Sequence, residues 1–310
     1  TTLTIPNSVT TISSSAFEDC TGLTTLTIPN SVTTIGSNVF KGCTSLTSLT
    51  VPFVGYNATT TSSSVSHLGY WFGAEIGSYN SSYVPKNLKT VIITNATRIG
   101  KSAFSGCGNI TSIVLNEGIT IINTSAFSGC TGLTEITIPS TVTRSNSSAF
   151  WECKNLQTVH ITDLDKWLNI IFDGNSANPM YYANELLLNG EPITGEVVIP
   201  ETVTTVPYYA LKNTQITSVI LHDNITAIQD GVFYGCTNLT NIDIPISVTT
   251  IGSYAFYGCT GLTKIDIPTN VTKINDYTFS GCTGLTEINM PANATTIGSY
   301  AFEGCTGLTT

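Results

Sequence analysis

The chain has 310 residues, of which 41% are hydrophobic and only 10% are charged, and its formal net charge is −9. This much periodic apolar content argues against a disordered chain, and the lack of clustered lysine and arginine argues against nucleic acid as a partner. No run of 18 or more apolar residues is present, so we expect no membrane insertion in this segment.

One motif recurs along the chain. The stretch "NSVTTIGSNVFKGCTSL" at 30–46 returns as "SVTTIGSYAFYGCTGL" at 247–262 and as "ATTIGSYAFEGCTGL" at 294–308. About twelve copies align, most of them 23 residues apart, with the consensus L-T-x-I-x-I-P-x-x-V-T-x-I-G-x-x-A-F-x-G-C-T-x. Such a period is typical of a solenoid, in which each coil buries its apolar face against its neighbours.

Each part of the repeat predicts a local structure. "LTxIxIP" alternates apolar and polar residues, as a half-buried strand does, and its proline ends the strand. "VTxIG" predicts a second short strand or an extended turn, and "AFxGC" is too short for a helix and predicts a tight or 3-10 turn. Together they predict a parallel β-sheet of short strands with turns on the other side.

We expect a single repeat domain over residues 1–310, with irregular coils at 46–87 and 156–215. The chain begins and ends inside a repeat and has no polar capping unit at either end. Since solenoids need such caps, we expect the chain to be a fragment of a longer one.

The repeat resembles the BspA-like (Treponema pallidum-type) leucine-rich repeat, and the resemblance covers nearly the whole chain. It implies a horseshoe-like leucine-rich repeat solenoid in a secreted or cell-surface protein. It also implies adhesion to host proteins or to other cells.

The first interruption, 53–87, is rich in serine, threonine and aromatic residues and lacks the "AFxGC" turn. Tyr70, Trp71 and Phe72 are its candidate binding residues, because insertions in solenoids often form the binding face. The alternative is that "GYWFG" packs against the neighbouring coils.

The second interruption, 161–195, contains "DLDKWLNIIF", whose apolar spacing predicts a short helix. Asp163 or Asp165 can cap this helix, and the alternative for the two carboxylates is an acid/base pair. Trp167 is predicted to be a core residue, with a ligand platform as the alternative.

All nine cysteines occupy one repeat column. Side chains that point the same way on stacked coils lie too far apart for a disulfide, so we expect buried free thiols. We expect no metal and no cofactor, because the column holds no histidine and no C-x-x-C. No catalytic motif occurs, the three histidines lie apart, and we expect no enzyme.

Two outward columns of the first strand become polar near the C-terminus. They supply the remaining candidate binding residues, which are Asn241, Asp243, Lys264, Asp266, Glu287 and Asn289. This surface suits a basic protein patch or a weak cation site, and the alternative is a solvated face that blocks aggregation. The same columns carry an apolar pair, Ile92 and Val114, nearer the N-terminus.

On the opposite wall, Tyr254, Tyr277 and Tyr300 form a column that either stabilises the coils or binds sugars through its ring faces.

We therefore predict an extracellular or cell-surface binding module, monomeric, that recognises a host extracellular-matrix or surface protein, or a glycan. The alternative is a structural spacer that presents another domain and has no ligand of its own.

Overall fold

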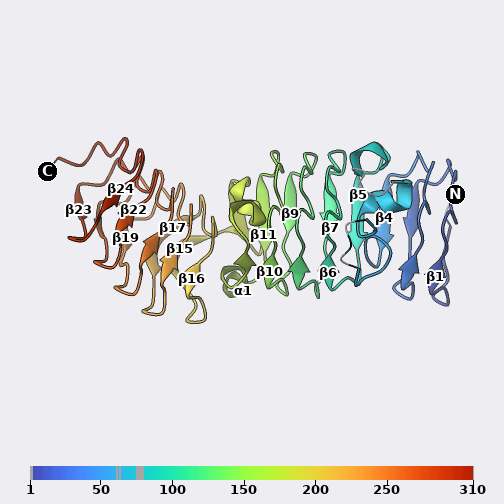
Figure 1. Ribbon diagram of the computed structural model, residues 1–310, viewed down its shortest axis with the longest axis horizontal. Helices are drawn as coiled ribbons and strands as arrows, with labels where there is room; N and C mark the ends of the chain where they lie inside the picture. Colours follow the sequence, from blue (N-terminus) through green and yellow to red (C-terminus); the bar gives the residue numbers. More distant parts are fainter. Residues whose placement is uncertain (1–2, 61, 63, 75–79, 310) are drawn as a thin grey trace. The chain divides into compact units, whose positions relative to one another are not determined.

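The computed structural model describes residues 3–60, 62, 64–74 and 80–309 (Figure 1). The chain divides into two compact units. Unit 1 is Thr1–Val159 with Phe172–Tyr182, and unit 2 is His160–Ile171 with Ala183–Thr310. Both are built from the same coil, and a single repeat domain over 1–310 stays a prediction.

The first strand series is formed by the "LTxIxIP" half of the repeat. In unit 1 it contains β2 (Thr25–Thr27), β4 (Ser48–Val51), β5 (Thr90–Ile93), β7 (Ser112–Val114) and β9 (Glu135–Thr137). In unit 2 it contains β15 (Thr194–Val198), β17 (Gln215–Ile220), β19 (Asn241–Ile242), β21 (Lys264–Asp266) and β23 (Glu287–Asn289). Successive strands pair in parallel with the repeat in register, so that Leu26 lies opposite Leu49 and Ile265 opposite Ile288. The predicted parallel solenoid of short strands is confirmed.

The second series is formed by "VTxI", and its members are two-residue strands rather than extended turns. They are β1 (Thr11–Ile12), β3 (Thr34–Ile35), β6 (Arg98–Ile99), β8 (Ile121–Ile122) and β10 (Arg144–Ser145) in unit 1, and β16 (Thr205–Val206), β18 (Ala227–Ile228), β20 (Thr250–Ile251), β22 (Lys273–Ile274) and β24 (Thr296–Ile297) in unit 2. β11 (Thr158–Ile161) and β12 (Ile171–Phe172) each contain a boundary between the units. β13 (Glu185–Leu188) and β14 (Glu191–Pro192) form an antiparallel hairpin.

The core is a set of apolar columns, of which the phenylalanine of "AFxGC" is the bulkiest. In unit 2, Phe233, Phe256 and Phe279 are fully buried, with ring centroids 5.2 Å and 5.4 Å apart along the stack. In unit 1, Phe104 and Phe127 stack at 5.6 Å. Each ring packs on the ring of the next coil, so no coil is stable by itself.

All nine cysteines are free, and seven of them are buried, whereas Cys20 is exposed and Cys305 is half-buried at the two ends of the column. Cys259 Sγ donates to the carbonyl of Phe233 in the preceding coil at 3.1 Å, and Cys282 Sγ does the same to Phe256. Where the column has a threonine, Thr214 Oγ1 donates to the Leu211 carbonyl at 2.7 Å. The column therefore needs a small donor as well as a small apolar group.

Both insertions rebuild the turn that their coils lack. The first forms the 3-10 helices η1 (Leu68–Phe72) and η2 (Asn80–Ser82). In η1 the carbonyl of Trp71 accepts the Phe40 amide at 2.7 Å, and the Leu68 amide donates to Ala103 at 2.8 Å. In the second insertion, within unit 1, η3 (Asn175–Ala177) accepts the Phe150 amide at the Ser176 carbonyl and is followed by η4 (Pro179–Tyr181).

The predicted helix of the second insertion is α1 (Leu164–Leu168) in unit 2. Asp163 caps it, accepting the Lys166 amide at 3.0 Å, which confirms the cap. Trp167 is buried and its Nε1 donates to the Ala210 carbonyl at 2.8 Å, which confirms it as a core residue.

Candidate functional site

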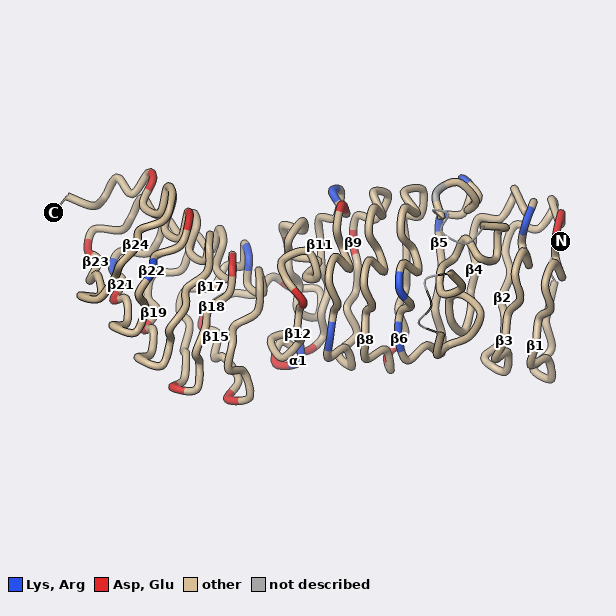
Figure 2. Tube along the Cα trace, in the orientation of Figure 1, with Lys and Arg blue, Asp and Glu red and all other residues tan. Residues whose placement is uncertain are grey.

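The net negative charge of the chain is concentrated in unit 2 (Figure 2). Unit 1 contains seven acidic and seven basic residues, whereas unit 2 contains thirteen acidic and four basic ones. The outward face of the first strand series in unit 2 carries the predicted polar residues, and we call it the unit 2 sheet face. It is defined by the outward residues of β15, β17, β19, β21 and β23 together with Asp243.

The polar end of the unit 2 sheet face is a connected set of side chains. Lys264 Nζ lies 2.8 Å from Glu287 Oε1 and 3.9 Å from Asp266 Oδ1. The amide of Asn289 donates to Asp266. The hydrogen bond to Glu287 and the charges of both carboxylates raise the pKa of the exposed Lys264. Lys264 lies between the carboxylates of Asp266 and Glu287 and therefore offsets part of the repulsion between these two negative charges.

Asn241 and Asp243 are both exposed. Asn241 pairs with Ser218 of β17 in the parallel ladder. All six polar residues predicted from the strand columns therefore lie outside the core, on solvent-exposed positions.

The same face carries an apolar pair that the sequence-based site omitted. Val198 and Ile220 lie opposite each other in the β15–β17 ladder, and they are 58% and 47% exposed. Other coils have threonine in this column, at Thr27, Thr50 and Thr137. The alignment of the repeats contains a sign of this apolar pair, because valine and isoleucine replace threonine at these two positions. In unit 1 the predicted pair Ile92 and Val114 also lie opposite each other, with Val114 half exposed.

The aromatic residues of the first insertion pack against the neighbouring coils, which is the alternative to ligand binding given in the sequence analysis. Trp71 is fully buried, Phe72 is 4% exposed, and both rings contact Phe40 at about 6 Å between centroids. Trp71 Nε1 donates to the Gly55 carbonyl at 3.0 Å. Tyr70 is only partly exposed, and burial raises its pKa. Since Trp71 and Phe72 fill the coil interior, the prediction that they bind a ligand is corrected, and they are left out of the candidate surface.

A buried amide anchors this insertion. Asn80 Oδ1 accepts the Gly69 amide at 2.6 Å and lies 2.9 Å from His67 Nδ1. Asn80 Nδ2 donates to the carbonyls of Ser102 and Ser105, at 3.1 Å and 2.8 Å. One side chain thus satisfies the polar groups of both the insertion and the next coil.

We expect Asn80→Ala to lower the free energy of unfolding by roughly 2–3 kcal/mol, because several buried polar groups lose their partner at once. Urea unfolding followed by circular dichroism measures the change. Ser82→Ala, which removes an exposed hydroxyl of the same insertion, is the control and should change it by under about 0.5 kcal/mol. Equal effects of the two variants would show that Asn80 is not the anchor.

The tyrosine column lies on the turn side of unit 2. Tyr254, Tyr277 and Tyr300 stack with ring centroids 4.7 Å and 4.9 Å apart and planes within 18° of parallel. Each has a left-handed backbone, with φ of 59°, 58° and 56°. This conformation costs a non-glycine residue roughly 1–2 kcal/mol, and stacking returns about 0.5–1.5 kcal/mol per pair. The rings occupy one another's faces, which disfavours the sugar-stacking alternative.

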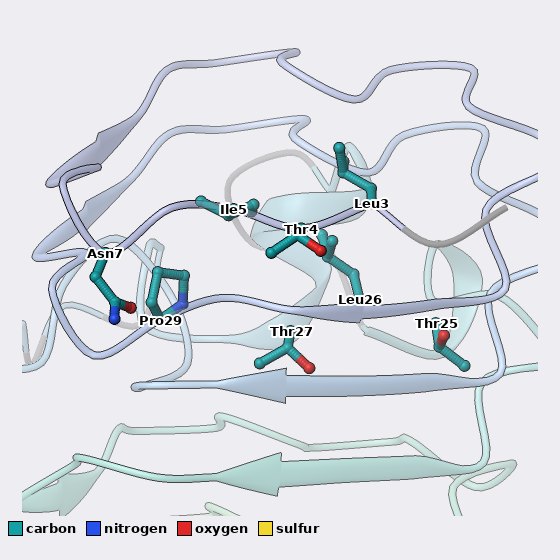
Figure 3. Close-up of a pocket in the computed structure, with 8 residues that line it drawn as sticks. All are labelled: Leu3, Thr4, Ile5, Asn7, Thr25, Leu26, Thr27 and Pro29. Carbon is teal, nitrogen blue, oxygen red and sulfur yellow. The ribbon is translucent and has the colours of Figure 1, made fainter.

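A pocket of about 250 Å³ lies beside the first strands of unit 1 (Figure 3). Its lining contains no titratable group and is formed by Leu3, Thr4, Ile5, Asn7, Thr25, Leu26, Thr27 and Pro29. It offers shape but no acid, base or metal ligand.

No group of three or more histidine, cysteine or acidic side chains is arranged to hold a metal ion within residues 3–60, 62, 64–74 and 80–309. The predicted weak cation site at Asp243 and Asp266 therefore has no third ligand of these types. Within the same described residues, no helix has the length and apolar character to cross a membrane.

The coil and its stacked columns define the class of protein, which is a leucine-rich repeat solenoid. The chain belongs to the BspA type leucine-rich repeat family, whose profile matches six copies over residues 1–65, 74–178 and 191–309. The resemblance found in the repeat sequence is confirmed.

Among solved structures, the chain is similar to a leucine-rich repeat protein from Bacteroides ovatus, with 24% identity over 97% of this chain and 81% of that one, and a TM-score of 0.49. It is similar to a leucine-rich cell surface protein from Faecalibacterium prausnitzii, with 28% identity over 91% and 83% of the two chains and a TM-score of 0.42. It is also similar to the pneumococcal vaccine antigen PcpA, with 19% identity over 95% and 72% and a TM-score of 0.45. No match was found among curated proteins.

Proposed function

We propose that the chain is an extracellular or cell-surface binding module that recognises a protein or glycan of a host or neighbouring cell through the unit 2 sheet face. The observation that carries the proposal is the exposed pair Val198 and Ile220, in register on this face. Other coils have threonine at these positions, whereas the two half-exposed β-branched side chains gain free energy when a partner covers them. An apolar centre with a polar rim is the usual composition of a protein interface.

The polar end of the face supplies the rim. Glu287 and Asp266 already contact Lys264, so their positions are fixed before a partner arrives. A fixed arrangement of charges gives orientation and specificity to a contact whose affinity comes from the apolar centre. We place no reaction on this surface.

The second candidate function is a structural spacer. It is favoured by the threonine columns, in which hydroxyls bond coil to coil: Thr47 Oγ1 donates to Thr24 at 3.0 Å, and Thr286 Oγ1 donates to Thr263 at 3.1 Å. These hydrogen bonds stabilise the stacking of the coils and do not contribute to ligand recognition. A spacer would show no ligand of its own.

The test is binding of the chain to a panel of extracellular-matrix proteins and glycans, measured by surface plasmon resonance. We expect Val198→Thr with Ile220→Thr to weaken binding by about tenfold or more, since these are the anchors. Asp243→Asn, Asp266→Asn and Glu287→Gln together should mainly slow association and reduce its salt dependence.

Thr27→Ser with Thr50→Ser, in the same column of unit 1, is the matched control and should leave binding unchanged. If wild-type protein bound nothing on the panel at micromolar concentration, the spacer would be the better account. If the apolar pair could be replaced without loss, the site would lie elsewhere.

A further inference from the structure

We infer that the turn side of unit 2 is a second interaction surface, which takes a cationic segment of another protein. Five tyrosines form it: Tyr234, Tyr254, Tyr257, Tyr277 and Tyr300. It is separate from the sheet face, because the "AFxGC" turns and the first strands are different segments of each coil.

The five rings make one connected surface. Tyr234 and Tyr257 stack at 4.6 Å, and Tyr257 contacts Tyr254 at 5.9 Å, which joins this pair to the column described above. Four of the rings are partly exposed and Tyr300 is 58% exposed. The core beneath is already filled by the stacked rings of Phe233, Phe256 and Phe279, so the tyrosines are not needed to complete it.

The backbone does not select tyrosine at the column positions. The same left-handed position holds serine or asparagine in unit 1, at Ser15, Asn38, Ser102, Ser125 and Ser148, and glycine at Gly231. These residues are the ones that this conformation favours or tolerates most easily. In unit 2 the position also holds Tyr209, with φ of 54°, but that ring is buried. Three consecutive coils further along place a more exposed ring there. A strained residue type that local structure does not require points to a role for its side chain.

The composition of the surface is that of a protein-binding one. The turns at 252–258, 275–281 and 298–304 consist mainly of tyrosine, serine and glycine, the residues that dominate antibody paratopes. Tyrosine supplies a large contact area at low entropic cost, and stacking fixes the orientation of these rings before a partner binds.

Charge identifies the partner as cationic. The turns that hold the five tyrosines contain Asp230, Asp276 and Glu303. Lys212 Nζ lies 5.6 Å from the centroid of the Tyr234 ring, so one ring of this surface already contacts a cation of the chain itself.

Asp276 and Glu303 lie at the column, because Asp276 Oδ1 accepts the amide of Ser299 at 2.8 Å and the Glu303 carbonyl accepts the amide of Gly281 at 2.7 Å. Phenol oxygens and carboxylates accept hydrogen bonds from guanidinium groups, whose planar fork of N–H donors matches carboxylate geometry. A second copy of this acidic chain lacks that complementarity.

The test uses a fluorescein-labelled octa-arginine peptide as the probe, with fluorescence anisotropy at physiological salt. Asp276→Asn with Glu303→Gln removes two negative charges from the turn surface. Asp243→Asn with Asp266→Asn removes two from the sheet face, so the two variants have the same net charge. We expect the first to weaken binding by about tenfold and the second by less than about threefold.

A third variant, Tyr254→Ser with Tyr277→Ser and Tyr300→Ser, keeps the net charge and installs the residue that unit 1 uses at this position. We expect it to weaken binding by about tenfold as well, with circular dichroism confirming the fold. Equal losses in the two charge variants would mean that affinity follows net charge, and would overturn the assignment. So would unchanged binding by the tyrosine variant, absence of peptide binding by wild type, or a glycan panel signal lost with the tyrosines while peptide binding is kept.

Discussion

Replacing Phe256 with alanine is expected to lower the free energy of unfolding by about 3–5 kcal/mol, the range for a fully buried phenylalanine. Phe256 has no exposed area and is stacked between Phe233 and Phe279, so its removal opens a cavity between two coils. In a stack, each coil relies on its neighbours, and the gap weakens two interfaces at once. Urea unfolding of the whole chain, followed by circular dichroism, measures the effect.

Ile246→Ala is the matched control for this variant. Ile246 is an apolar residue of the same unit that is 59% exposed, so its truncation should cost less than about 0.5 kcal/mol. A change of under about 1 kcal/mol for Phe256→Ala would mean that the coil closes without the ring. The phenylalanine column would then not be the core of the solenoid.

The second large effect is loss of stability in alkali. Burial raises the pKa of Cys236 and of Cys282 from 9.0 to about 12, and it raises that of Cys259 as well. Between pH 9 and 12 the unfolded chain therefore loses thiol protons that the folded chain keeps. The folded state binds more protons in this window, so the free energy of unfolding falls as pH rises.

The contribution of these thiols is fully present below pH 9. Above it, each thiol costs about 1.4 kcal/mol of stability per pH unit, so Cys236 and Cys282 together remove roughly 3 kcal/mol by pH 10. Burial lowers the pKa of Lys212 to about 8, so between pH 8 and 10.5 the unfolded chain keeps a proton that the folded chain loses, and this one group works in the opposite direction. The buried thiols outnumber it, so we expect the urea midpoint to fall above pH 9.

Cys236→Thr with Cys282→Thr tests the cause. Thr214 occupies the same column and donates its hydroxyl to the Leu211 carbonyl of its own turn instead of to the preceding coil, so the coil accepts this residue. Between pH 9 and 11, the urea midpoint of the variant should fall less steeply with pH than that of wild type. Identical pH profiles would assign the loss to other groups, such as Tyr234, whose pKa burial also raises.

The repeat sequence predicted the coil because its period repeats a single local solution. Alternating residues place Leu26 and Leu49 inward at matching positions, and the same step recurs with each copy. The insertions have no such period. That Trp71 completes a coil depends on Phe40, which lies 31 residues away, and the sequence "GYWFG" gives no indication of this partner.

The candidate surfaces were predicted in part. Strand alternation placed Asp266 and Glu287 outward, but the contact of both with Lys264 depends on side-chain rotamers that a sequence does not specify. The left-handed backbone of Tyr277 was also hidden, because a tyrosine gives no sign of positive φ in the sequence. Breaks in the repeat pattern located these surfaces better than residue type alone did.

The central claim is that the repeated residues build the scaffold and that recognition lies where the repetition fails. The most direct test returns one column to the repeat, with Val198, Ile220, Asp243 and Asp266 all changed to threonine, as at Thr27 and Thr50. The measurement is equilibrium binding of this variant and of wild type to the matrix-protein and glycan panel. We predict loss of binding with an unchanged urea midpoint. Binding equal to that of wild type would contradict the claim, because the regular scaffold would then be the part that recognises the ligand.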